Sequence, residues 1–293
     1  MIIVTGATGQ LGRQIVERLL DRVPAEGIGV SVRDPGRAAD LAARGVRVRR
    51  GDFADPETLA ESFAGAEQVL VVSVDQTGPA AIARHTAAID AARAAGAKRI
   101  LYTSHQAAAA SSAFAPMPDH AATEHHLAGT GVPYTALRNG FYAGTIAHLL
   151  GRALETGELI APADGPVSWT AHADLAEATA AILANPLDAD GPTPPLTAPE
   201  ALDLADVAAL LTDLTGRTVR RVVAEDEEWT ASLTSHGVPA EQASMLLGMF
   251  TASRRGEFAT TDPTLERLLR RRPIPVRSLL QDLARNAGAQ ASG

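Results

Sequence analysis

The first half of the chain alternates between two kinds of hydrophobic pattern. Short apolar runs rich in β-branched residues, each long enough for one strand, occupy 2–5, 28–32, 46–49, 68–74, 99–103 and 134–138. Longer alanine- and leucine-rich stretches with helical spacing lie at 10–21, 36–44, 56–64, 80–95 and 119–129. Strands that alternate with helices are typical of βαβ units, in which helices cover both faces of a parallel sheet. The pattern predicts an α/β fold with a doubly wound parallel sheet of the Rossmann type.

The alternation weakens after Asn139, and a proline-rich stretch at 185–199 interrupts it. The later periodicity is mostly helical, with helices expected at 201–214, 226–236, 240–250 and 276–285 and one strand at 218–223. We therefore expect two parts. The sheet domain covers 1–139, and a segment near 166–184 returns to it. A smaller, mainly helical lobe at 140–293 binds the substrate.

A glycine-rich turn joins the first expected strand to the first expected helix. The spacing Gly6-x-x-Gly9-x-x-Gly12 lies directly between them, the context in which this motif binds a dinucleotide. Gly6 permits the tight turn, Gly9 lets the backbone approach a pyrophosphate, and Gly12 lets the helix pack closely on the sheet. Free amides at the helix start then hold the anion. The predicted cofactor residues of this turn are Gly6, Ala7, Thr8, Gly9, Gln10, Leu11 and Gly12.

The residues after the next strands indicate which dinucleotide binds. Arg33 follows the second strand, where an arginine accepts the 2′-phosphate of NADP and an acidic residue would bind the ribose of NAD. NADP(H) is favoured, and Asp34 is expected to cap the following helix instead. Asp52, after the third strand, is suitably placed to meet the adenine edge. The residues expected to line the ribose and phosphates after the fourth strand are Ser73, Val74 and Asp75.

Composition narrows the range of functions. The chain has 293 residues, no cysteine and a formal net charge of −8. Disulfides, thiolate metal sites and a thiol nucleophile are thereby excluded, and the negative charge counts against nucleic-acid binding. No apolar stretch approaches the length of a membrane span, and the apolar start leads into the glycine turn without a cleavage site, so a cytoplasmic location is expected. His120, His125 and His126 lack metal-ligand spacing, and we expect no metal site.

Several further motifs lie between residues 95 and 142 of the chain, and the resemblance that they carry covers nearly the whole of it: Ala95-Gly96-Ala97-Lys98 before Tyr102-Thr103-Ser104, Asp119-His120 with Thr123-Glu124, and Tyr134-Thr135-Ala136-Leu137-Arg138-Asn139-Gly140-Phe141-Tyr142. With the glycine turn, they resemble the atypical short-chain dehydrogenases related to NmrA, and among these the type 2 NAD(P)H:quinone oxidoreductases. The resemblance implies that the glycine turn, Arg33 and Ser73 to Asp75 contact NADP. It also implies that Asn139, Gly140, Phe141 and Tyr142 flank the nicotinamide and the substrate pocket.

The chain departs from ordinary short-chain dehydrogenases in the general acid that protonates the reduced substrate. Those enzymes use a Tyr-x-x-x-Lys pair, but Lys98 is the single lysine here and Ala94 stands four residues before it. Where members of the resembled family carry a lysine after Thr-Glu, this chain has His125. Hydride addition to a ketone nearly requires a positioned acid. Hydride addition to a quinone yields a phenolate-like anion whose basicity is comparable to that of tyrosinate, with a conjugate-acid pKa of about 10, and water can protonate it. The hypothesis is an NADPH-dependent oxidoreductase that reduces quinones or similar electron-poor acceptors.

Candidates for the acceptor pocket are aromatic or carry a hydrogen-bond donor. Phe141, Tyr142 and Trp169 could wall a flat acceptor, although ordinary core packing is an equal alternative for Trp169. Ser104, His105 and Tyr142 could donate a hydrogen bond to its oxygen. Two other readings stay open: a redox sensor that binds NADP(H) without turnover, and a reductase of a cationic dye-like or polyketide acceptor. The expected partner is a small molecule, and the sequence leaves the oligomeric state open.

Overall fold

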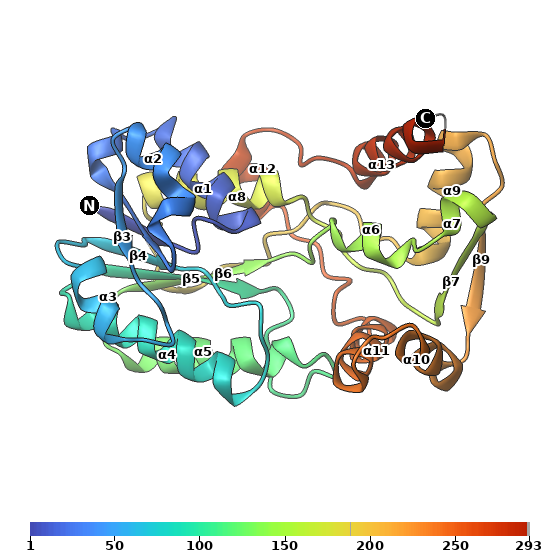
Figure 1. Cartoon of the computed structure of the whole chain (residues 1–293), viewed down its shortest axis with the longest axis horizontal. Coiled ribbons are helices and arrows are strands. Elements are labelled where there is room, and N and C mark those ends of the chain that lie inside the picture. Colours follow the sequence, from blue (N-terminus) through green and yellow to red (C-terminus); the bar gives the residue numbers. More distant parts are fainter. Residues whose placement is uncertain (188, 292–293) are drawn as a thin grey trace.

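A seven-stranded sheet organises the larger part of the protein (Figure 1). The computed structural model describes residues 1–187 and 189–291, with 286–291 as backbone only. All neighbouring strands of this sheet are parallel, in the order β3-β2-β1-β4-β5-β6-β8. Their bounds are β1 (Ile2–Thr5), β2 (Ile28–Val32), β3 (Arg47–Arg50), β4 (Gln68–Val71), β5 (Arg99–His105), β6 (Tyr134–Asn139) and β8 (Gly191–Pro192). The chain order reverses beside β1, which confirms the predicted doubly wound sheet.

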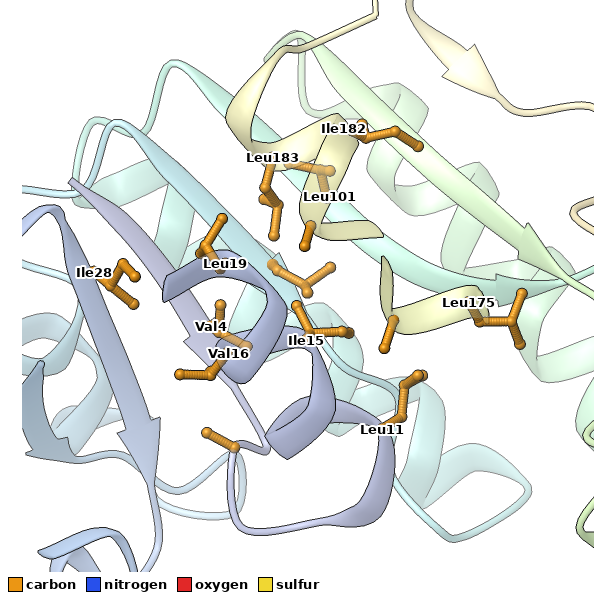
Figure 2. Close-up of a cluster of buried hydrophobic side chains, with 14 of the residues drawn as sticks. Val4, Leu11, Ile15, Val16, Leu19, Ile28, Leu101, Leu175, Ile182 and Leu183 are labelled. Atoms are coloured by element: carbon orange, nitrogen blue, oxygen red, sulfur yellow. The ribbon is translucent and has the colours of Figure 1, made fainter. Parts of the chain in front are cut away.

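Helices cover both faces of the sheet because its central strands are apolar on both sides. One face carries α1 (Gln10–Leu20), η2 (Pro35–Ala38), α2 (Ala39–Ala43), α8 (His172–Ala184) and α12 (Thr264–Leu269). The other carries α3 (Glu57–Ser62), α4 (Pro79–Ala94) and α5 (Pro116–Gly129). A short η1 (Ala25–Gly27) precedes β2. Figure 2 shows the core on the first of these faces, where Leu183 of α8 points toward Leu19 of α1.

A second lobe has its own apolar core and lies at one end of the sheet domain (Figure 1). Its strands β7 (Glu158–Pro162) and β9 (Arg220–Ala224) form a parallel pair. Its helices are α6 (Thr145–Leu149), α7 (Ala153–Thr156), α9 (Leu204–Thr215), α10 (Asp226–Ser235), α11 (Ala240–Arg254) and α13 (Val276–Ala291). The predicted helical character of the C-terminal part is confirmed. Within the described ranges, no helix is long and apolar enough to cross a membrane.

The sheet domain also draws on segments from beyond Asn139. α8 packs against α1, α12 packs against α8, and β8 joins the edge of the sheet beside β6. β8 comes from the proline-rich stretch in which we expected no strand, and β7 and the short helices α6 and α7 were not predicted either. The fifth strand runs on to His105, two residues beyond the expected end, which brings Ser104 and His105 into β5.

Candidate active site

The predicted site residues follow one another along the carboxyl edge of the sheet. Arg33 follows β2, the glycine turn follows β1, and Ser73 follows β4. His105 ends β5 and Asn139 ends β6, so both lie at the same edge. Ligands of open α/β sheets bind at the carboxyl ends of the strands, near the point where the strand order reverses. The spatial order of the residues thus runs from the expected phosphate contacts at β2 and β1 to the expected nicotinamide contacts at β5 and β6.

The glycine turn leaves the start of α1 open. Gly9 donates its amide to the Gly6 oxygen at 2.9 Å and accepts from the Arg13 amide at 3.0 Å, so the turn is closed by its own backbone. No side chain caps α1, and its first turn carries no acidic residue. A Cβ on Gly12 would lie 2.3 Å from the Gly6 oxygen, which explains the glycine at this position. The positive helix end and its unpaired amides fit a pyrophosphate.

Arg33 is exposed and has no hydrogen bond or ion pair to the described part of the chain. The Asp34 carboxylate accepts from the Gly36 amide at 3.0 Å and caps η2, as expected from the sequence. One oxygen of Asp52 accepts from the Ala54 amide at 2.9 Å. An uncommitted guanidinium beside an uncapped helix start fits the phosphate groups of NADP(H) better than the ribose hydroxyls of NAD(H).

The loop after β4 is fixed by hydrogen bonds to its neighbours. The Ser73 amide donates to the Thr103 hydroxyl at 2.8 Å, and the Val74 amide donates to Nε2 of His85 at 2.9 Å. Asp75 is exposed at the end of this segment. The backbone that was predicted to line the cofactor ribose is therefore held by β5 and by α4.

The end of β6 holds a polar group that the fold does not satisfy. Asn139 is 0% exposed, and neither atom of its amide has a hydrogen-bond partner among the described residues. Leaving such a group unpaired costs about 1–3 kcal/mol, and the exceptions deserve a functional explanation. The next residue has a packing role, because a Cβ on Gly140 would lie 2.2 Å from the Thr170 hydroxyl. Contact of Asn139 and Gly140 with the cofactor stays a prediction.

Aromatic rings from both lobes gather beside the end of β5. The Phe141 ring lies edge-on to His105, with centroids 5.4 Å apart, and to Phe258, with centroids 5.0 Å apart. Phe114 stacks on Phe141 at 5.8 Å. Trp169 lies against Phe141 at 5.3 Å, is only 2% exposed, and donates its indole N–H to the Leu202 oxygen. We call the rings of Phe114, Phe141 and Phe258 the aromatic wall. Trp169 supports this wall from within the core, so the core-packing alternative describes it.

The second lobe is tied to this wall through the Phe258 backbone. Its oxygen accepts from the amide of Ser168, from the Ser168 hydroxyl and from the side-chain amide of Gln106, which directly follows β5. Ser168 also donates to the side-chain oxygen of Gln106 at 2.8 Å. These bonds hold the Phe258 ring against His105, where the ring centroids are 5.7 Å apart. The sequence indicated neither Phe258 nor Phe114, because both lie in irregular segments.

The three predicted donors lie in different surroundings. Ser104 is 2% exposed, and its hydroxyl donates to Glu124 at 2.6 Å. Glu124 also forms a bidentate ion pair with Arg138, so the Ser104 proton is engaged within the sheet–helix interface. The Tyr142 ring lies tilted against that of His172, with centroids 4.2 Å apart, and outside the cluster around Phe141. His105 alone of these donors lies inside the aromatic wall.

A model of the NmrA-like family matches residues 1–274. The chain belongs to the NmrA-like family. It is 36% identical over 272 residues to quinone oxidoreductase 2 of Escherichia coli K12, an alignment that covers 92% of this chain and 93% of the relative. The crystal structure of the NADPH-dependent E. coli enzyme with NADPH superposes with a TM-score of 0.91 at 34% identity, covering 97% and 99% of the chains. The crystal structure of Citrobacter sp. triphenylmethane reductase with NADP(H) superposes with a TM-score of 0.89 at 32% sequence identity, covering 97% of this chain and 100% of the reductase.

The lysine and the histidine at the family's lysine position lie away from the aromatic wall in this NmrA-like protein. Lys98 is exposed before β5, at the opposite end of that strand from His105. His125 is exposed and, with His126, borders a surface hollow between α4 and α5. In the described ranges, no group of three or more histidine, aspartate or glutamate side chains is arranged to hold a metal ion. The position that carries a lysine in the resembled family therefore offers no acid at the acceptor site here.

Proposed function

We propose that this NmrA-like protein is an NADPH-dependent reductase of quinones or similarly electron-poor conjugated acceptors. The observation that carries the proposal is the order of groups along the sheet edge: the unpaired Arg33, the open start of α1, and the aromatic wall at the ends of β5 and β6. That order follows the parts of an extended NADP(H) molecule. The activities of E. coli quinone oxidoreductase 2 and of triphenylmethane reductase support the same class of reaction.

The sheet part, 1–139 with the segment near 166–184, holds the cofactor in this proposal, and the lobe within 140–293 closes the acceptor side. Arg33 binds the 2′-phosphate, and the first amides of α1 bind the pyrophosphate. NADPH, when bound, supplies a hydride. Phe141 and Phe258 keep water from the reacting atoms and orient a flat ring. The chain supplies positioning and a dry site, and an easily reduced acceptor needs little more.

Purified protein mixed with NADPH and a panel of small benzo- and naphthoquinones tests the proposal. The expected result is quinone-dependent loss of the NADPH absorbance band, with much weaker turnover of simple ketones. A Phe258→Ala variant should lose kcat and raise the KM for quinone, because the acceptor wall is opened, while its affinity for NADPH stays the same. Binding of NADPH without oxidation by any acceptor would refute the reductase and favour a redox sensor.

A cationic dye-like acceptor is the second candidate. It is favoured by the similarity to triphenylmethane reductase, which spans 97% of this chain. Aromatic faces attract a delocalised cation, and no lysine lies at the wall to repel it. A triphenylmethane dye offered beside a naphthoquinone separates the two, because the preferred substrate has the higher kcat/KM.

A further inference from the structure

Two histidines and a tyrosine form a hydrogen-bonded chain beneath the aromatic wall. They come from three elements: His85 from α4, Tyr102 from β5 and His120 from α5. The Tyr102 hydroxyl lies 2.7 Å from Nδ1 of His120 and 3.3 Å from Nδ1 of His85. Tyr102 and His85 are 0% and 2% exposed.

The direction of each hydrogen bond follows from the backbone. The Val74 amide can only donate, so Nε2 of His85 is an acceptor and a neutral His85 carries its proton on Nδ1. That proton lies within reach of the Thr123 hydroxyl oxygen and of the Tyr102 oxygen. The Thr123 hydroxyl is itself engaged with the Asp119 oxygen. Because Nδ1 of His85 carries a proton, it cannot accept the proton of Tyr102. The shorter contact of the Tyr102 hydroxyl, 2.7 Å to Nδ1 of His120, is the one to which it donates.

This chain fixes the tautomer of His120. Because Nδ1 accepts from Tyr102, the proton of a neutral His120 ring resides on Nε2. Burial lowers the pKa of His85 to about 4, and burial, with His105 and His85 nearby, holds the pKa of His120 well below its ordinary value. Burial also raises the pKa of Tyr102, so the hydroxyl keeps its proton. All three groups are neutral near pH 7, and each has one defined proton position.

The Nε2–H of His120 is left free for a ligand. No described residue pairs with this atom, and it is not among the buried atoms that lack a partner, so solvent reaches it. Its ring stacks beside that of His105, with centroids 6.3 Å apart and an interplanar angle of 25°. His105 in turn lies edge-on to Phe141 and Phe258. A neutral N–H donor with a fixed tautomer thus borders the wall at the end of β5.

We infer that His120 donates its Nε2–H to the acceptor oxygen on which negative charge develops, and that Tyr102 and His85 are positioning residues for this donor. The inference rests on the proposed reductase function. A neutral imidazole can polarise a carbonyl in this way. A hydride, which carries two electrons, passes from NADPH to the quinone and leaves NADP+ and a hydroquinone anion. His120 keeps its proton, and water supplies the proton that completes the hydroquinone.

Kinetics of three full-length variants with NADPH and a naphthoquinone test the donor. His120→Phe should lower kcat about tenfold, the worth of one hydrogen bond of about 1.4 kcal/mol, with the KM for NADPH unchanged. His120→Gln places an amide N–H near the position of the imidazole Nε2 and should recover most of the rate. The exposed His125→Phe is the matched control on the same helix and should behave as wild type.

Nitrogen NMR of protein labelled with 15N-histidine reads the tautomer without turnover. The resonances of His120, assigned by comparison with His120→Gln, should show a protonated Nε2 and an unprotonated Nδ1. Tyr102→Phe should give a mixture of tautomers and a several-fold lower kcat with an unchanged KM for NADPH. A proton on Nδ1 in wild type, or a His120→Phe variant within twofold of wild-type kcat, would overturn the inference and leave the reductase intact. Wild type without any turnover refutes the reductase itself.

Discussion

Adding one methyl group at Gly12 should weaken cofactor binding and should also lower the stability of the fold. A Cβ there would lie 2.3 Å from the Gly6 oxygen and 3.1 Å from the Ala7 nitrogen. Ordinary contacts need about 3.5 Å, so the turn and α1 must separate by about 1 Å. Both neighbours are backbone atoms, and neither can rotate away. The separation spreads the amides that we assign to the pyrophosphate.

The loss of NADPH affinity can be estimated from the hydrogen bonds between the turn and the pyrophosphate. A charge-assisted hydrogen bond contributes about 1.5–3 kcal/mol, and one such bond lost in Gly12→Ala raises the Kd for NADPH roughly thirtyfold. Overpacking lowers the free energy of unfolding by about 1–3 kcal/mol. Fluorescence titration with NADPH measures the first effect and urea unfolding the second. Gly129→Ala is the control, because a Cβ there meets nothing within 4 Å. A Gly12→Ala variant that binds NADPH as wild type does would refute the assignment of this turn.

Three further predictions concern single charges. Arg33→Ala should weaken the binding of NADPH about tenfold or more and leave the binding of NADH unchanged, because only NADPH carries the 2′-phosphate. Fluorescence titration measures both Kd values, and an equal loss of affinity for the two cofactors would contradict the prediction. Arg271→Met should lower the free energy of unfolding by about 3 kcal/mol in urea, since it leaves the fully buried Asp174 carboxylate without its cation and with only the Ile274 amide as a partner, whereas the neighbouring Arg272→Met should not. His85, with a folded pKa of about 4, binds its proton more readily when unfolded, so it should contribute a fall in stability of about 1.6 kcal/mol from pH 6.5 to 5. Burial lowers the pKa of His105 to about 3, which adds a similar fall, so urea unfolding of His85→Asn should show only the His85 part removed.

The sheet was predictable because periodicity reports burial on both faces. Each of the first six strands and the helices between them left a separate apolar run, and their alternation indicated the doubly wound sheet. β8 could not be seen in this way, because Gly191–Pro192 is two residues long and joins the sheet through backbone pairing. The lobe was harder, since α6 and α7 have only five and four residues, too few to show a helical period.

The cofactor edge was predictable for a different reason. The glycine turn and Arg33 act through their position after a strand, which sequence reveals directly. The acceptor side depends on contacts between distant segments: Phe258 reaches His105 only because Gln106 and Ser168 hold its backbone. Strand alternation could have placed Tyr102 on the same face as Ser104, toward α5. It could not have shown that α4 and α5 bring His85 and His120 to its hydroxyl.

The stoichiometry of the anaerobic reaction tests the central claim most directly. Wild-type protein, NADPH and a naphthoquinone should consume NADPH and form hydroquinone one for one, at a rate proportional to protein concentration and reduced in Gly12→Ala. NADPH that binds and stays reduced in the presence of every quinone and dye offered would contradict the account, and would leave a dinucleotide-binding protein that performs no reduction.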